Sequence, residues 1–149
     1  MMSGYQNQPE KTAEASWYDD SGERWQRMGD IGRVDEEGFV TLLGRSKDMI
    51  ISGGFNIYPR DLEDALLKQP EVVDAAVIGI PSREWGETPL GFVVAAGGET
   101  LDLPAVCARA NAELGKTQRI SALKQLDELP RSHIGKILKT ALRKLVSET

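Results

Sequence analysis

The sequence predicts an α+β fold, a small domain with a sheet of about three strands packed by two or three helices, preceded by a two-stranded hairpin. Short apolar runs of strand length alternate along the chain with segments whose apolar residues recur at helical spacing. Proline and glycine stand between these segments, where helices begin and strands end. With 149 residues, the chain is long enough for one core and an ordered appendage, but short for two full domains.

The predicted hairpin lies in the N-terminal third of the chain. Residues 1–20 are polar and show no sustained period, which indicates a connection that adds nothing to a core. One strand-like run precedes the acidic turn at 35–38, and a second run, led by Phe39, follows it, which is the pattern of a β-hairpin. Such a hairpin is only marginally stable by itself.

The small domain follows the hairpin. A β-branched run at 49–51 stops at the turn residues Ser52-Gly53-Gly54, and Pro59 opens a short helix that ends near Lys68. The remaining expected elements are, in order, strands at 72–80 and 89–95, a helix at 103–114, a strand at 120–126 and a helix at 137–146. Proline, serine and glycine hold the loop before the last helix out of helical conformation.

Composition and charge exclude several classes of function. The net charge is −5 and charges of both signs are interspersed, so the basic surface of a nucleic-acid-binding or membrane-binding protein is absent. The single cysteine, Cys107, lies in an alanine-rich helical pattern, which favours a reducing compartment. No apolar run is long enough to span a membrane, and the N-terminus lacks the pattern of a signal peptide. We expect a soluble, cytoplasmic protein that handles small molecules or contacts other proteins.

Two segments contain residues suited to nucleotide chemistry. Asp30, in WQRMGDIG, offers two acceptor oxygens for vicinal sugar hydroxyls, although an aspartate here also fits a turn that bonds its own backbone. Arg45 carries a fork of donors for phosphate or ribose oxygens, but it also fits a surface salt bridge. Gly53 and Gly54 allow a ligand to approach the backbone closely, or they simply end a strand.

A third segment, LPRSHIGKILK, presents Lys136 on a loop at the root of the last helix. Its compact ammonium suits the negative charge that develops on an acyl phosphate, and the same position also fits a solvated lysine. His133, the single histidine, has no catalytic partner placed by a motif, so a loop role and an acid–base role stay open. Trp85 fits either the core or the lip of a binding channel. No spacing of metal ligands occurs.

The segments GDIGRVDEEGFVTLLGRSKDMIISGGFNIYPRDLE and LPRSHIGKILK resemble, in order and spacing, the last motifs of the AMP-forming adenylating enzymes, in particular the acyl-CoA synthetases. The resemblance covers essentially the whole chain, including SGYQNQPEKTAEAS. It implies that residues 1–44 are the tail of a large N-terminal adenylating domain. Residues 45–149 would then be a mobile C-terminal domain with a hinge near 45–48.

The resemblance also implies roles for individual residues. These roles are ribose binding for Asp30, nucleotide contact for Arg45, the hinge for Lys47, the CoA tunnel for Gly53 and Gly54, and catalysis of adenylation for Lys136. The full enzyme would be an acyl-CoA synthetase with ATP, accompanied by magnesium, and CoA as co-substrates of a small carboxylic acid. The domain would rotate between the adenylation step and the thioester step, and the N-terminal domain would be its partner.

Some features depart from this pattern. Met28 stands where the family commonly has threonine, and His133-Ile134 replace small residues ahead of Lys136. The chain also has no phosphate loop rich in serine, threonine and glycine and no acyl pocket, so we expect an enzyme fragment that is inactive alone. Two further functions fit the same residues: a stand-alone interaction or regulatory module without catalysis, and the end of a peptide-synthetase adenylation domain.

Overall fold

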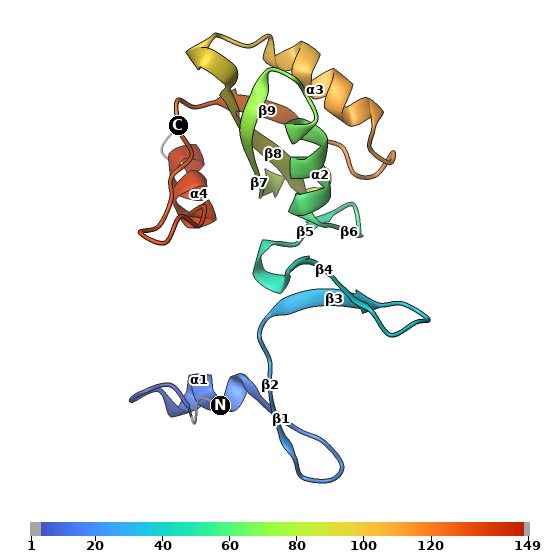
Figure 1. The fold of residues 1–149 in the computed structure, drawn as a ribbon, viewed down its shortest axis with the longest axis vertical. Helices are drawn as coiled ribbons and strands as arrows, with labels where there is room; N and C mark the ends of the chain where they lie inside the picture. The colour runs from blue at the N-terminus through green and yellow to red at the C-terminus, as the bar shows by residue number, and fades with distance from the viewer. Residues whose placement is uncertain (1–3, 148–149) are drawn as a thin grey trace. The chain divides into compact units, whose positions relative to one another are not determined.

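The computed structural model describes residues 4–147, and the chain divides into two compact units, Met1–Ser46 and Lys47–Thr149 (Figure 1). The boundary between these units follows Ser46, two residues beyond the one expected from the sequence and inside the segment 45–48 expected as the hinge, whose motion stays a prediction. None of the helices formed by the described residues is long and apolar enough to cross a membrane.

The first unit contains one short helix and two separate two-stranded sheets. Helix α1 (Pro9–Glu14) is followed by β1 (Ser16–Tyr18) and β2 (Arg24–Gln26), which pair antiparallel. The predicted hairpin is confirmed as β3 (Asp30–Val34) and β4 (Val40–Arg45). The expectation of a plain connection before it missed α1 and β1, because elements of six and three residues are too short to show a period.

The turn between β1 and β2 is organised by Asp19. Its carboxylate accepts hydrogen bonds from the Ser21 hydroxyl (2.6 Å), the Trp25 indole nitrogen (2.8 Å) and the backbone N–H of Glu23 (2.9 Å). Because these donors favour the charged form, they lower the pKa of Asp19 from 3.8 to about 2. The hairpin is therefore held by polar contacts, and no residue from 4 to 46 is buried.

The second unit is built on a five-stranded sheet in the order β6-β5-β8-β7, with β9 parallel to β8. Its elements are β5 (Ile50–Ser52), β6 (Phe55–Ile57), α2 (Pro59–Leu67), β7 (Val72–Ser82), β8 (Gly86–Ala95), α3 (Leu103–Ala112), β9 (Ala122–Gln125) and α4 (Lys139–Ser147). The α+β class is confirmed. The sheet has more strands than the three expected, because β5 and β6 form a hairpin that joins it at the Ser52–Gly86 pair.

Helices cover both faces of this sheet. Within the second unit, α2 and α3 lie on one face and α4 lies on the other (Figure 1). Strand β7 serves both cores, because Ala75 and Val77 pack toward the first face while Ala76 and Ile78 pack toward the second. This double burial explains why the strand has a continuous apolar run instead of an alternating pattern.

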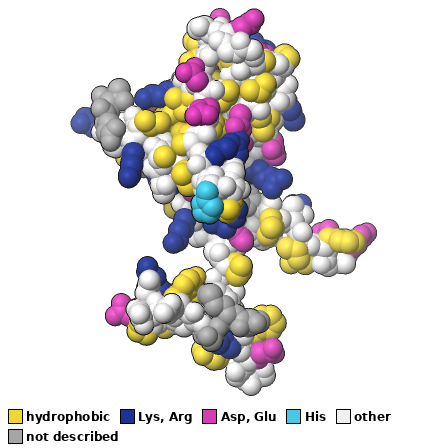
Figure 2. All heavy atoms as spheres, turned by 60° about the vertical axis from the view of Figure 1, so that its left-hand side comes forward, with side chains coloured by type: hydrophobic (Ala, Val, Ile, Leu, Met, Phe, Trp, Pro, Cys, Tyr) yellow, Lys and Arg dark blue, Asp and Glu magenta, His cyan; other side chains and the backbone are white. Residues whose placement is uncertain are grey.

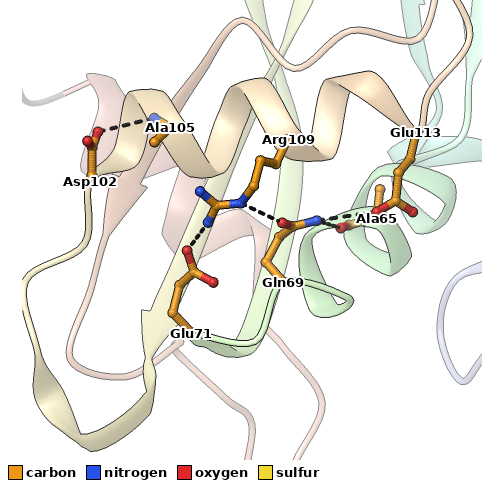
Figure 3. A network of polar contacts seen from close by, with 7 residues as sticks. All are labelled: Ala65, Gln69, Glu71, Asp102, Ala105, Arg109 and Glu113. Atoms are coloured by element: carbon orange, nitrogen blue, oxygen red, sulfur yellow. Dashed lines mark hydrogen bonds and ion pairs between the residues drawn. The ribbon is translucent and has the colours of Figure 1, made fainter.

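Local signals set where the helices begin. Pro59 opens α2, and Asp102 caps α3 by accepting a hydrogen bond of 3.1 Å from the backbone N–H of Ala105 (Figure 3). Helix α4 begins at Lys139, two residues later than expected, because Ile137 forms a bridge with Arg131. The loop before α4 is therefore a closed turn and not the first turn of a helix.

Candidate functional site

Asp30 and Arg45 are cross-strand partners in the first unit. They occupy facing positions in the β3–β4 register, and Nε of Arg45 lies 3.3 Å from Oδ1 of Asp30. The backbone N–H of Ser46 donates to the carbonyl of Gly29 (2.8 Å), which closes this end of the hairpin. The structure thus pairs Arg45 in a surface salt bridge, the alternative that its sequence position also fitted, with Asp30; a carboxylate and a guanidinium are also groups that can bind a ribose and a phosphate.

Lys47 is the first residue of the second unit. Its side chain is exposed, and it is the middle residue of a short 3₁₀ helix, Ser46–Asp48. The next residue, Asp48, accepts a hydrogen bond of 3.1 Å from Arg143 of α4. The chain is therefore anchored to the second unit immediately after Lys47.

Gly53 and Gly54 form the tight turn between β5 and β6. Both have positive φ, 57° and 82°, as the central residues of a type I′ turn do. The backbone N–H of Gly53 donates to the carbonyl of Trp85 (2.9 Å), and a Cβ atom at position 53 would lie 2.7 Å from Cε3 of the Trp85 ring. Trp85 lies against this turn, with 52% of its surface exposed, and is not part of the core.

A pocket of about 310 Å³ opens beside this turn. Its lining includes the aromatic rings of Phe55 and Trp85 and the basic side chains of Lys116 and Arg119. Aromatic faces stack on nucleobases, and guanidinium and ammonium groups bind phosphates. Sequence reasoning named Trp85 as a possible channel lip but missed the other lining residues, because the β5–β6 hairpin, the β7–β8 turn and the segment after α3 share no pattern along the chain.

Lys136 lies at the end of a loop that closes on itself. The backbone N–H of Ser132 donates to the carbonyl of Lys136 (2.8 Å), and the Lys136 N–H donates to the Ser132 hydroxyl (3.2 Å). Gly135 makes the turn possible with a φ of 80°. The Lys136 side chain is exposed, and within residues 4–147 its ammonium has no hydrogen-bond or ion-pair partner.

Three other long basic side chains near this loop form ion pairs. They pair with carboxylates on three separate elements: Arg131 with Asp74 of β7, Lys139 with Glu63 of α2, and Arg143 with Asp48. Arg131 also donates to the carbonyl of Gly135 (2.7 Å). The loop is thus held to the sheet on both sides of Lys136 while the Lys136 ammonium stays available.

The candidate residues of the second unit fall into separate groups. Among the described residues, no hydrogen bond or ion pair joins the Lys136 loop to the Gly53–Gly54 turn. His133 is exposed on this unit, where it is the cyan side chain in Figure 2 and lies among Lys and Arg side chains. Within residues 4–147, no three histidine, cysteine, aspartate or glutamate side chains are grouped so that they could hold a metal ion.

Comparison with known proteins identifies related chains. The curated relatives include a 3-[(3aS,4S,7aS)-7a-methyl-1,5-dioxo-octahydro-1H-inden-4-yl]propanoyl:CoA ligase of Rhodococcus jostii, 40% identical over 143 residues, and a 2-succinylbenzoate–CoA ligase of Bacillus mycoides, 41% identical over 145 residues. These matches cover 96% and 97% of this chain. ATP-bound MatB from Rhodopseudomonas palustris matches with a TM-score of 0.84 and 38% identity over 96% of this chain.

The chain spans only 27% and 29% of the length of these two ligases, and 28% of the MatB chain. The family match itself is to the AMP-binding enzyme C-terminal domain, over residues 61–136. This range is about half of the chain and runs from the first turn of α2 to Lys136. The chain therefore belongs to the family of AMP-binding enzyme C-terminal domains.

Proposed function

We propose that this chain is the C-terminal part of an AMP-forming acid–CoA ligase, and that Lys136 acts in the adenylation step. One observation carries the proposal: a domain of the AMP-binding family presents, on a braced and exposed loop, an ammonium that has no partner among residues 4–147. The two curated relatives are named as CoA ligases, and the MatB structure contains ATP, which supports ATP and CoA as co-substrates.

In the first half-reaction, a carboxylate oxygen of the acid attacks the α-phosphorus of ATP. The bond from this phosphorus to the bridging oxygen breaks, and pyrophosphate leaves with the electron pair, so that an acyl-adenylate remains. Negative charge shifts onto the phosphoryl oxygens as the bonds exchange, and the Lys136 ammonium stabilises it. Asp30 would hold the ribose hydroxyls, while Arg45, its partner at 3.3 Å, would contact the same nucleotide.

The first unit supports an N-terminal adenylating domain as the partner. It has no buried residue between positions 4 and 46, and it exposes large apolar side chains, among them Trp17, Tyr18, Val34, Phe39 and Val40. Apolar surface of this extent is normally covered by another part of a protein.

The described residues contain no grouping that fits magnesium, so we assign no step to that ion in this chain.

In the second half-reaction, the domain turns about Lys47 and brings the Gly53–Gly54 turn to the adenylate. The CoA thiol loses its proton to solvent as its sulfur attacks the acyl carbon, the bond from this carbon to the phosphate oxygen breaks, and AMP leaves with the electron pair. The pocket beside the turn supports this assignment, because Trp85 and Phe55 suit the adenine of CoA, and Lys116 and Arg119 suit its phosphates.

ATP, CoA and a reduced Cys107 are consistent with a cytoplasmic enzyme. The named relatives use chemically different acids, so the proposal specifies a carboxylic acid and no particular one.

A chimera tests the proposal. This chain would replace the matching C-terminal part of the Bacillus mycoides 2-succinylbenzoate–CoA ligase, and pyrophosphate release would be measured with ATP and 2-succinylbenzoate. We expect the chimera to form the adenylate, and Lys136→Ala to lower its rate by about a hundredfold or more, the usual cost of a lost charge-stabilising group. Lys144→Ala, at an exposed lysine of α4, the helix that follows the Lys136 loop, is the matched control and should leave the rate unchanged.

Two results would contradict the proposal. Retention of adenylation by the Lys136→Ala chimera would remove Lys136 from the chemistry. Equal rates from the chimera and from the isolated N-terminal part would favour an interaction or regulatory module without catalysis.

For the thioester step, Arg119→Met should raise the KM for CoA about tenfold while adenylation stays the same, because a charged hydrogen bond to phosphate is lost.

A further inference from the structure

Lys139 and Glu63 form the least exposed ion pair among the described residues. Nζ of Lys139 lies 2.7 Å from Oε1 of Glu63, and the two side chains are 17% and 20% exposed. The same carboxylate oxygen accepts a hydrogen bond of 2.9 Å from the backbone N–H of Val77. Glu63 therefore joins three elements, α2, β7 and the first residue of α4, at a single point.

This point lies close to Lys136 along the chain. Lys139 begins α4, and the short segment between it and Lys136 is held by the Arg131–Ile137 bridge and by the hydrogen bond of 2.7 Å from Leu138 N–H to the Pro130 carbonyl. Because these contacts fix both ends of the segment between Lys136 and Lys139, the direction of the Lys136 side chain depends on the position of the start of α4. The Lys139–Glu63 pair sets that position against α2.

We propose that Glu63 and Lys139 are positioning residues for Lys136, and that they serve adenylation but not the thioester step. This inference rests on the proposed function of Lys136. Among residues 4–147, no hydrogen bond or ion pair connects either side chain to the Gly53–Gly54 turn or to the pocket beside it. A displacement of about 1 Å at a catalytic group can cost about a hundredfold in rate, so the effect of losing the pair should be selective and measurable.

The test uses the chimera with its two half-reactions measured separately. Lys139→Met keeps an unbranched side chain that is one atom shorter and removes its charge. We expect it to lower the rate of adenylate formation by about tenfold to a hundredfold and to change thioester formation from supplied acyl-adenylate by less than about twofold. Lys139→Arg should restore most of the adenylation rate. The double variant Glu63→Gln/Lys139→Met, which leaves no unpaired carboxylate, should show the same selective loss as Lys139→Met.

The matched control is Lys68→Met, which breaks the Lys68–Glu113 pair of 2.9 Å on the same unit, where the side chains are 65% and 40% exposed. This variant should leave both half-reactions unchanged. If the pair acts through Lys136, then Lys139→Met should cause no further loss of adenylation in the Lys136→Ala background. Such a result would distinguish positioning from a general loss of structure.

Two results for Lys139→Met would overturn the inference: equal losses of rate in the two half-reactions, or a further loss of adenylation in the Lys136→Ala background. The ion pair would then have only a structural role. Unchanged adenylation in Lys139→Met would also overturn the inference. The two proposals fail in different ways. If Lys136→Ala itself leaves adenylation intact, the proposed function of Lys136 fails; if Lys136→Ala abolishes adenylation while Lys139→Met has no effect, only the positioning role fails.

Discussion

Arg143 of α4 donates a hydrogen bond of 3.1 Å to Asp48, although the two residues are 95 positions apart in the chain. Asp48 directly follows Lys47, the first residue of the second unit. The contact therefore ties the start of this unit to the helix that follows the Lys136 loop. Any rotation about Lys47 would carry that helix and its loop along with it.

Breaking this contact should loosen the start of the second unit. Arg143→Met should lower the free energy of unfolding by about 0.5–1 kcal/mol, since both side chains are partly exposed and solvent weakens the pair. Urea denaturation of the full chain measures this change. Arg60→Met, which breaks the more exposed Arg60–Asp64 pair of 3.9 Å, is the control and should cost less. An equal cost for the two variants would show that Asp48 is not a special anchor.

The two glycines of the β5–β6 turn should differ in their tolerance of alanine. At either position alanine requires a positive φ, which costs about 1–2 kcal/mol. At position 53 its Cβ would also lie 2.7 Å from the Trp85 ring, whereas position 54 has no atom within 4 Å of an added Cβ. Gly53→Ala should therefore be the more destabilising change, by about 1 kcal/mol or more, because the ring must move.

Denaturant unfolding of both glycine variants checks this order. Because Trp85 also lines the pocket, Gly53→Ala should weaken CoA binding in the chimera more than Gly54→Ala does. Identical unfolding midpoints would mean that the Trp85 ring does not rest on Gly53 in solution.

Gln69 is the buried centre of the polar network in Figure 3. The side chain is 5% exposed, donates to the Ala65 carbonyl (3.1 Å) and accepts from Nε of Arg109 (3.1 Å), which also pairs with Glu71. Gln69→Leu should lower the free energy of unfolding by about 1–3 kcal/mol, because buried hydrogen-bonding groups lose their partner.

A similar substitution at an exposed glutamine is the control for Gln69. Gln118 makes one exposed hydrogen bond of 3.2 Å to Asp61, so Gln118→Leu should change the stability by less than about 0.5 kcal/mol. Thermal unfolding followed by circular dichroism measures both variants. A neutral Gln69→Leu variant would show that the network between α2 and α3 contributes little.

The stability of the β1–β2 hairpin should depend on pH through Asp19. Hydrogen bonds from Ser21, Trp25 and Glu23 lower its pKa from 3.8 to about 2, so the ionised carboxylate stabilises the folded hairpin above pH 3.8. This contribution is lost as the pH falls through about 2. Titration of the Asp19 carboxyl carbon by NMR should give a midpoint near 2, and Ser21→Ala should raise that midpoint. A midpoint near 3.8 in the unchanged chain would contradict the turn geometry.

The sequence by itself determined the elements whose residues repeat a local pattern. The buried face of α2, which begins at Pro59, and the continuous apolar run that became β7 could both be predicted. The face of a helix and a strand buried on both sides each depend on residues that are close together in the sequence. The β3–β4 hairpin was readable from its acidic turn. The β-branched run that became β5 was also readable, but helix α1 and strand β6 were not, since these two elements are too short for a period to appear.

The candidate site divides in the same way. Asp30, Gly53, Gly54 and Lys136 could be named from motifs, and their catalytic and binding roles stay predictions that the experiments above test. Only the tertiary structure decided that the Lys136 ammonium has no partner among the described residues, whereas Lys139 is bound to Glu63, 76 positions away. An ion pair across such a distance leaves no periodic signal, because it exists only after α2, β7 and α4 have packed on one sheet.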